Sequence, residues 1–319
     1  MVSNIAVVGS ICLDYGLRLD HLPKIGETVL STDLTVPVGG KGFNQALQAH
    51  NLGSKVHFFG RLGDDPPGHM IIEQLEGINF PVRGLRVLRD EKTALGLIFI
   101  GPDGKNMIGG FSGANMNISV DDIDQNVYDA LLISSHLILQ LEIPIEVCHA
   151  ALKLAKEQYV RTVLNFAPYR EVGPGIEELV DIFIFNEVEA SQFFKMTIET
   201  AGDFFKVKES AKYLFEKIYI VTLGDKGAAI IAPEGDYYSS GIKVDSIDST
   251  GAGDSFVGAY VHFIANGEGY IRSIDLANIV AADSTTRLGA MPSLPSRERV
   301  EELMAENEIQ LNDEDDFLN

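Results

Sequence analysis

Residues 248–264 read Asp248-Ser-Thr-Gly-Ala-Gly-Asp-Ser-Phe-Val-Gly-Ala-Tyr-Val-His-Phe-Ile264. A glycine-rich stretch with a carboxylate here runs into apolar residues at helical spacing, which predicts a loop that opens a helix. The first amides of a helix have no internal hydrogen-bond acceptor and carry partial positive charge. The amides of Gly251, Ala252 and Gly253 can therefore face phosphate oxygens.

Asp254 lies at the start of this expected helix, where its negative charge would repel a phosphate. A carboxylate beside a transferred phosphate is instead suited to be a general base, which takes a proton from the attacking hydroxyl. The segment therefore predicts phosphoryl transfer with Asp254 as the base. An ordinary glycine-rich loop capped by Asp254 is the alternative.

Short β-branched or aromatic runs alternate with longer helical patterns along the whole chain. Such alternation predicts βαβ units, and thus an α/β fold with a doubly wound, mainly parallel sheet flanked by helices. The expected strands are residues 5–8, 56–60, 137–141, 162–165, 182–185 and 218–222. The expected helices are residues 42–51, 68–76, 119–132, 144–158, 187–194, 200–216, 252–266, 271–286 and 296–306.

Two parts of the N-terminal half break this alternation. Residues 11–20, 27–38 and 93–109 have an extended or hairpin pattern, and the Asp-Gly pair within residues 102–105 is a strong turn signal. We expect a small β-sheet lid built from insertions at about 11–38 and 93–111. A set of loops without a sheet is the alternative. Because no repeat or linker divides the chain, residues 1–319 are expected to form one domain.

The composition is that of a globular protein, with 319 residues of which 45% are apolar. No apolar run approaches the roughly 20 residues that span a bilayer, and the first residues have the pattern of a strand and not of a signal peptide. The cytoplasm is therefore the expected compartment. Cys12 and Cys148 are too few for a disulfide framework and are expected to be reduced thiols.

The net charge of −21 argues against nucleic acids and anionic membranes as partners, since clustered Lys and Arg bind phosphate backbones. Such a chain must bind an anionic nucleotide through backbone dipoles, a few placed cations and a bound metal. The acidic residues 301–316 have the pattern of a solvated helix and a frayed end.

A second glycine-rich stretch, Gly39-Gly-Lys-Gly-Phe-Asn-Gln-Ala46, leads from an extended segment into a helix. Asn44 offers donors and an acceptor for sugar hydroxyls, and the glycines let a ligand approach the backbone. A strand–helix junction with an exposed Lys41 is the alternative. The stretch is not a Walker A loop, because Gly42 follows Lys41 in place of Ser or Thr. No GxGxxG follows the first strand, which disfavours a nicotinamide dehydrogenase.

Further polar residues follow expected strands, where α/β proteins commonly bind ligands. Asp14 and Glu142 can accept hydrogen bonds from hydroxyls, although a surface turn and a helix cap are the alternatives. Asn186 and Glu189 can share a helical face and direct Mg²⁺ through water, with capping by Asn186 as the alternative. The stretch Thr222-Leu-Gly-Asp-Lys-Gly227 can lay its backbone against nucleotide phosphates or form a plain hairpin turn.

The order and spacing of these segments, GGKGFNQA, NEVE, VTLGDKG and DSTGAGD, resemble the ribokinase or PfkB family of carbohydrate kinases over nearly the whole chain. Further agreement lies at residues 26–29, 63–65, 112–115, 141–142, 165–168 and 286–293. The resemblance implies a β-lid that closes over the sugar and forms a homodimer. It also implies transfer of the γ-phosphate of ATP to the primary hydroxyl of D-ribose. A kinase for fructose, another pentose or a nucleoside is one alternative, and a non-catalytic sugar-binding sensor is another.

The resemblance also implies roles by position, with Asp254 as the base and Gly251, Ala252 and Gly253 as the anion hole. The sugar is expected at Cys12, Asp14, Gly40, Lys41, Gly42, Phe43, Asn44, Glu142 and Asp254. ATP is expected at Asn186, Thr222, Leu223, Gly224, Asp225, Lys226, Gly227, Gly253 and Asn278. Mg²⁺ is expected near Asn186 and Glu189. An activating K⁺ ion is expected, mostly on backbone oxygens, at Asp248, Thr250, Ser284, Arg287, Gly289 and Ser293.

Two residues depart from the family pattern near the expected sugar pocket. Cys12 stands where the family usually has Asn, which removes a donor and an acceptor for the sugar. Phe43 replaces the usual small Ala. A larger or less polar acceptor than ribose is therefore more plausible than in a chain with the full motif.

Overall fold

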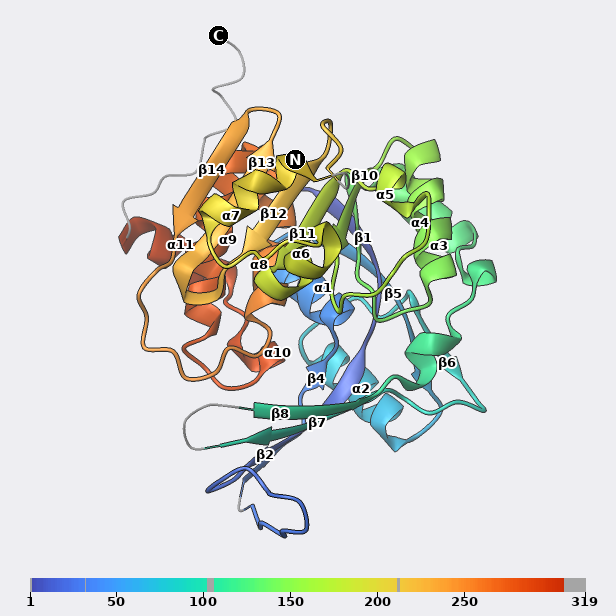
Figure 1. The fold of residues 1–319 in the computed structure, drawn as a ribbon. Coiled ribbons are helices and arrows are strands. Elements are labelled where there is room, and N and C mark those ends of the chain that lie inside the picture. The colour runs from blue at the N-terminus through green and yellow to red at the C-terminus, as the bar shows by residue number, and fades with distance from the viewer. Residues whose placement is uncertain (1, 32, 102–105, 211–212, 307–319) are drawn as a thin grey trace.

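The computed structural model of the chain describes residues 2–31, 33–101, 106–210 and 213–306. Within these residues the main sheet has nine strands, in the order β14-β13-β12-β11-β10-β9-β1-β5-β6 (Figure 1). The strands are β1 (Asn4–Val8), β5 (Lys55–Gly63), β6 (Leu85–Leu88), β9 (His136–Leu139), β10 (Arg161–Asn165), β11 (Ile182–Asn186), β12 (Ile218–Thr222), β13 (Gly227–Ala232) and β14 (Gly235–Ser240). All pairs from β12 to β6 are parallel, and the pairs β12–β13 and β13–β14 are antiparallel. The mainly parallel, doubly wound sheet is thus confirmed.

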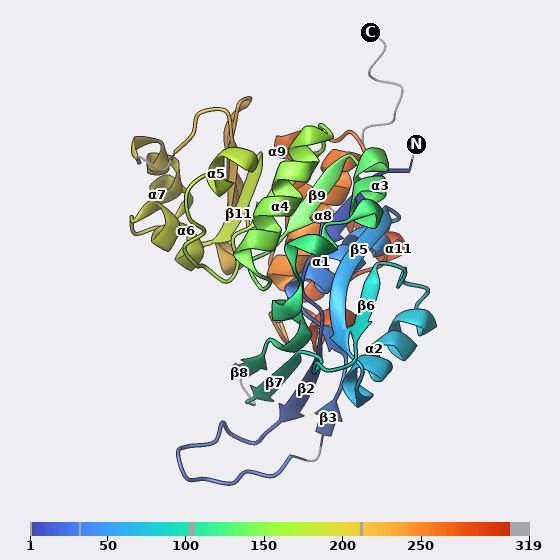
Figure 2. The same ribbon diagram turned by 90° about the vertical axis from the view of Figure 1, so that its right-hand side faces the viewer.

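The main sheet is buried on both faces, because successive side chains of a strand point to opposite sides. In β1, Ile5 and Val7 belong to one apolar core, and Ala6 and Val8 belong to the other. The first core is covered by α1 (Lys41–Asn51), α2 (Pro66–Gly77), α8 (Ala252–Ala265), α9 (Tyr270–Ser284) and α11 (Arg297–Glu306). The second is covered by α3 (Gln125–Ile133), α4 (Ile145–Glu157), α5 (Ile176–Leu179), α6 (Glu187–Phe194) and α7 (Ala201–Phe205), as Figure 2 shows in part. None of the helices in the described ranges is long and apolar enough to cross a membrane.

A second, smaller sheet projects from one end of the main layers (Figures 1 and 2). Its strands are β2 (Cys12–Arg18), β3 (Asp33–Thr35), β4 (Val38–Gly39), β7 (Leu95–Ile100) and β8 (Asn106–Phe111). They run in the order β3-β2-β7-β8, and β4 also pairs with β2. The strands come from the two segments expected to form a lid, and the predicted small sheet is confirmed. The turn expected at residues 102–105 lies outside the described residues.

Two expected helices are interrupted. The helix expected at 119–132 becomes a 3-10 turn over Val120–Asp122 followed by α3, because the Asp124 side chain accepts a hydrogen bond from the Asn126 amide (2.9 Å) and starts a new helix. The helix expected at 200–216 gives way after α7 to a 3-10 turn over Lys206–Glu209. The antiparallel strands β13 and β14 were not expected. In β13 every residue is buried, so the segment lacks the alternating pattern of a half-exposed strand.

Helices α1 and α8 approach each other closely at Gly258. A Cβ atom at this position would lie 2.4 Å from the Gln45 carbonyl oxygen and 2.8 Å from the Gln48 Cβ atom. The Ser255 hydroxyl also donates to the Gln48 side-chain carbonyl (3.0 Å). Because the two backbones nearly touch, the first turns of α1 and α8 face one another.

Replacing Gly258 by Ala should force α1 and α8 apart, since backbone atoms of Gln45 cannot rotate away. We expect a loss of about 1–3 kcal/mol in the free energy of unfolding, as for other overpacked sites. Gly77→Ala is the matched control, because an added Cβ there meets nothing within 4 Å. Urea unfolding of both variants measures the difference, and equal stability of the two would contradict the close contact.

Candidate active site

Asp254 lies in the first turn of α8, and its side chain is buried. The helix begins after Gly251, whose φ of 80° lies in the left-handed region that favours glycine. An added Cβ at Gly253 would meet no heavy atom within 4 Å, so the space beside this turn is open. Among the described residues the Gly253 amide has no acceptor, whereas the Ala252 amide donates to the Ser249 carbonyl oxygen (3.2 Å). The buried Asp254 carboxylate and the free Gly253 amide thus belong to adjacent residues.

Both oxygens of Asp254 accept hydrogen bonds from the first turn of α1. Asn44 Nδ2 donates to Oδ2, and Gln45 Nε2 donates to Oδ1, each over 3.0 Å. Asp254 also raises the pKa of Lys41, against the effect of burial. The GGKGFNQA and DSTGAGD segments, which lie about 200 residues apart in the sequence, therefore form one site.

A chain of buried amides holds Gln45 in place. Gln45 Nε2 also donates to Asn165 Oδ1 (2.9 Å), and Gln45 Oε1 accepts from Gln140 Nε2 (2.7 Å). With its polar atoms all engaged, the Gln45 amide cannot turn over without losing these bonds. No motif assigned a role to Gln45, Gln140 or Asn165. For Gln140 and Asn165 the sequence did contain a signal, because each polar residue ends the apolar run of a strand, β9 or β10. Ligands bind at these ends of the strands in α/β sheets.

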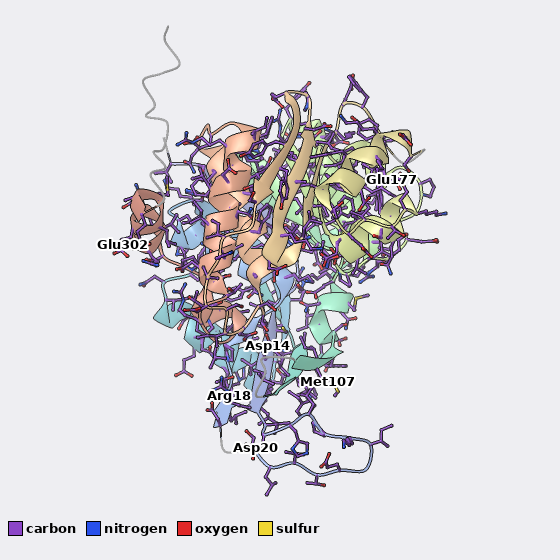
Figure 3. The ribbon with its side chains drawn as sticks, turned by 60° about the vertical axis from the view of Figure 1, so that its left-hand side comes forward. Asp14, Arg18, Asp20, Met107, Glu177 and Glu302 are labelled. Atoms are coloured by element: carbon purple, nitrogen blue, oxygen red, sulfur yellow. The ribbon has the colours of Figure 1, made fainter. Side chains whose placement is uncertain are left out.

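Asp14 lies where β2 leaves the main layers, as marked in Figure 3, and it lies near Cys12, Glu142 and Asp254. Glu142 also lies near Lys41. Burial raises the pKa of the Asp14 carboxyl, and Glu142 and Asp254 add to the effect. The Cys12 thiol donates to Asp14 Oδ1 (3.2 Å), and burial followed by the charge of Asp14 raises the pKa of this thiol. Glu142 and Asp254 thus act on both Asp14 and Lys41, and Glu189 also acts on Lys41, so carboxylates are crowded at this site.

The residues that begin α1 are held against the first strand. The Lys41 amide and the Ser10 hydroxyl both donate to Glu142 Oε2, over 3.2 and 2.6 Å. Ser10 Oγ in turn accepts from the Gly42 amide (3.2 Å), and Gly40 immediately precedes the helix. Glu142 thus ties the end of β9 to the start of α1.

Phe43 does not face this site. Its side chain is fully buried in the first core, where its ring packs edge-on against Phe58 and Phe80 at centroid distances of 6.4 and 5.2 Å. The expectation that the Phe43 side chain shapes the sugar pocket is therefore corrected. A helix presents its residues to different sides, so Asn44 and Gln45 can reach Asp254 while Phe43 fills the core.

A cleft of about 360 Å³ separates the second sheet from the loop before α8. Asp14, Gly16 and Thr35 line it from the second sheet, and Asp248 and Gly289 line it from the main layers. Asp14 thus borders a hollow large enough for a small polar molecule.

The residues expected to bind ATP form a second group. Asn186 and Thr222 are direct neighbours at the ends of the parallel strands β11 and β12. The stretch from Thr222 to Gly227 is a tight turn between β12 and β13, in which the Leu223 amide donates to the Gly227 carbonyl oxygen (2.7 Å). Asn278 Nδ2 donates to the carbonyl oxygen of Ser240 (3.3 Å), the residue that pairs with Gly227.

Two features of this group differ from a bare phosphate loop. The stretch forms the hairpin turn that was the alternative interpretation, with Gly224–Lys226 as a 3-10 turn that includes Asp225. The Lys226 ammonium donates to the Glu199 carbonyl oxygen (3.1 Å) and is already engaged. Any contact of this turn with phosphate would therefore come from its backbone.

Asn186 and Glu189 form a reciprocal helix cap. The Glu189 amide donates to Asn186 Oδ1 (2.8 Å), and the Asn186 amide donates to Glu189 Oε2 (2.9 Å). Burial raises the pKa of Glu189, while Lys41 lowers it and Asp254 raises it further. Capping is thus established, and a buried carboxylate in the field of Lys41 and Asp254 also fits water-mediated Mg²⁺. Among the described residues no group of three or more His, Cys, Asp or Glu side chains could enclose a metal directly.

The segments expected to bind K⁺ meet at Asp248. Its Oδ1 accepts from the Thr250 amide and hydroxyl (2.9 and 2.6 Å), and its Oδ2 accepts from the Gly289 amide (2.8 Å). Asp248 is buried, and in the described part of the chain no Lys, Arg or His nitrogen lies within ion-pair distance of it. A buried carboxylate that has hydrogen-bond donors but no cationic partner fits a monovalent cation.

Other members of this group are already occupied. Arg287 donates twice to the Ser293 carbonyl oxygen (3.2 and 2.8 Å) and pairs with Asp283. The Ser284 hydroxyl donates within α9, to the Ala281 carbonyl oxygen (2.7 Å). The Ser293 carbonyl oxygen thus already accepts hydrogen bonds from Arg287, and its contact with a cation stays a prediction.

Comparison with known proteins agrees with this geometry. The pfkB family carbohydrate kinase model matches residues 2–297. A ribokinase of Dictyostelium discoideum is 33% identical, covering 94% of this chain and all of that protein. A deoxyribokinase of Salmonella typhi is 30% identical, covering 96% of this chain and all of that protein.

A solved structure of a ribokinase also resembles this chain over nearly its whole length. The Arabidopsis thaliana ribokinase complexed with ribose and ATP superposes with a TM-score of 0.85 at 28% identity, covering 95% of this chain and 99% of that one. The fold and nearly the whole length of the chain thus have counterparts in a single family. The chain belongs to the pfkB family of carbohydrate kinases and is a sugar kinase of the ribokinase type.

Proposed function

We propose that the enzyme transfers the γ-phosphate of ATP to the primary hydroxyl of D-ribose, with Asp254 as the general base. The observation that carries the proposal is the buried Asp254 carboxylate, which Asn44 and Gln45 hold beside the open first turn of α8. A base must be held within reach of the proton that it removes. Its position next to a free helix amide places that proton transfer where phosphate charge would be stabilised.

The remaining residues support a division of labour. Asp14 and Glu142 would accept hydrogen bonds from sugar hydroxyls, and Lys41 would offset the negative charge that gathers there. Asn186, Thr222 and Asn278 would hold the nucleotide. Mg²⁺, organised through water near Glu189, supplies positive charge for the phosphates when bound. K⁺ at Asp248 would steady the loop that carries the anion hole.

A 2-deoxypentose is a second candidate acceptor, and Cys12 favours it. The Cys12 thiol already donates its hydrogen bond to Asp14 Oδ1. Unlike an Asn side chain, it offers no carbonyl and no amide group to a sugar hydroxyl. One relative at 30% identity is a deoxyribokinase. Loss of a hydroxyl from the substrate would cost little where the protein has no group to pair with it.

We also propose that the whole chain is one domain and that it forms a cytoplasmic homodimer through the second sheet. Leu97, Met107 and Phe111 lie on the same face of the β7–β8 pair, and each side chain is about half exposed. A contiguous exposed apolar face supports association with a second copy.

Replacing Asp254 by Asn should lower the turnover number by roughly 10²–10⁴, because the base is lost. The variant should still fold. The Asn44 amide can turn over so that its Oδ1 atom, which has no partner, accepts from the new amide. Steady-state kinetics with a coupled ADP assay measures the effect.

The control for this variant is binding of ATP and ribose, measured by calorimetry. Binding close to that of the wild type with the turnover lost would assign the loss to the chemical step. Turnover equal to that of the wild type would rule out Asp254 as the base.

Replacing Cys12 by Asn should raise kcat/KM for ribose relative to 2-deoxyribose by about tenfold, the value of one or two added hydrogen bonds. Cys12→Ser is the matched control, because it supplies a hydroxyl but no amide group. A panel that also contains fructose and a nucleoside identifies the natural acceptor. A ratio unchanged by Cys12→Asn would show that position 12 does not contact the sugar hydroxyl.

K⁺ should raise turnover several-fold over Na⁺ or a salt-free buffer, because it would neutralise the buried Asp248 and fix the loop before α8. It should also raise the melting temperature, since a ligand that binds only the folded state stabilises it. Equal turnover and equal melting temperature in the three buffers would remove the cation from the proposal.

A further inference from the structure

A cavity lies at the end of the main sheet opposite to Asp254. His136 and Arg161, the first residues of β9 and β10, line it, whereas Glu142 and Asn165 mark the active-site ends of the same two strands. Its volume of about 880 Å³ is within the range of small-molecule sites. We call it the strand-start cavity, and its charged and aromatic lining includes His136, Arg161, Glu234, Glu268, Tyr270 and Arg272.

Buried polar atoms without partners gather in two places in the described part of the chain. Asn44 Oδ1 and Gln140 Oε1 lie at the active site. The others belong to Tyr260, Arg272 and Ser273, near the turn from α8 to α9 that borders the strand-start cavity. Burying a donor without an acceptor is costly, so these atoms mark an incomplete polar network behind the wall of the cavity.

The two arginines of the cavity have donors to spare. Arg272 Nε lies 3.1 Å from Glu268 Oε2, but its N–H is not directed at that oxygen, and Arg272 Nη2 has no hydrogen bond. The Arg161 guanidinium lies over the Tyr270 ring, 5.3 Å from its centroid, and within the described residues it has no carboxylate within ion-pair distance. Arg272 is thus ion-paired with Glu268, whereas Arg161 lacks a carboxylate partner among the described residues, which is unexpected in a chain with a net charge of −21.

The rest of the lining offers acceptors and an aromatic surface. Burial, with a contribution from Arg161, lowers the pKa of His136 to about 4, so its imidazole is neutral near pH 7. The positive charge of the cavity therefore comes from its arginines. Glu234 and Glu268 can accept hydrogen bonds from hydroxyl groups, and Tyr270 presents a ring edge or face.

We propose that the strand-start cavity is a second ligand site, which binds a small hydroxylated organic anion through Arg161 and Arg272. Its acidic group meets the guanidinium donors, and its hydroxyl groups meet Glu234 and Glu268. Sugar phosphates and hydroxycarboxylates share this chemistry. The site is separate from the proposed phosphoryl transfer, so its existence does not depend on the identity of the sugar acceptor.

A single tryptophan can report on this cavity, because the chain contains none. Tyr159 lines the cavity and is 98% exposed, so Tyr159→Trp should not disturb the fold. Its fluorescence would be titrated, without ATP, with ribose 5-phosphate, citrate and inorganic phosphate at constant ionic strength. We expect a saturable change with ribose 5-phosphate or citrate, and the arm that responds identifies the source of the anion.

The variants Arg272→Gln and Arg161→Gln, each made in the Tyr159→Trp protein, should weaken binding by about tenfold or more, as expected when a charged hydrogen-bond donor is lost. Arg161 is exposed, so its variant keeps the test valid if Arg272→Gln does not fold. Arg89→Gln, at an exposed turn, is the matched control and should leave binding unchanged.

Three outcomes would overturn the proposal. The first is no saturable change with any of the three anions at millimolar concentration. The second is a response that both Arg161→Gln and Arg272→Gln leave unchanged. The third is equal affinity for inorganic phosphate and the two organic anions, because the hydroxyl groups would then contribute nothing.

Discussion

The close contact of α1 and α8 is the constraint on which the site depends. Gly258 lets the two helix backbones approach, and their first turns then bring Asn44 and Gln45 to the Asp254 carboxylate. A buried carboxylate is tolerated only when polar partners compensate for its lost hydration. The two amide donors meet this need and at the same time orient the carboxylate. The same bonds therefore serve the stability of the helix pair and the geometry of the base.

Crowding of like charges defines the electrostatics around this contact. Asp14 and Glu189 are buried carboxyl groups with raised pKa values, and Lys41 has a raised pKa because Asp254 lies near it. In an acidic protein the site thus concentrates negative charge around one lysine. Such a site gains from added cations, which supports the proposal that Mg²⁺ and K⁺ bind with the nucleotide.

The order of strands and helices could be predicted from the sequence because it depends on local pattern. Buried parallel strands are continuous apolar runs, and the helices between them carry apolar residues on one side, so residues such as Ile182–Asn186 and Glu187–Phe194 are recognisable one element at a time. The antiparallel pair β13–β14 was not predicted, because β13 is buried throughout and has no alternating pattern, and β14 contains few apolar residues. The break before α3 was not predicted, because the helical pattern of residues 119–132 could have formed one continuous helix. In the structure Asp124 caps a new helix within that pattern.

By itself, the sequence determined the family and the glycine-rich start of α8, and it predicted Asp254 as the base, since each rests on residues that are neighbours in the chain. Only the tertiary structure decided what surrounds them. Gln45 meets Gln140 and Asn165 across 95 and 120 residues, and no local pattern encodes such a contact. Phe43 stands in the same motif as Asn44 yet fills the core, because helix geometry turns adjacent side chains to different sides. The strand-start cavity is likewise assembled from distant segments.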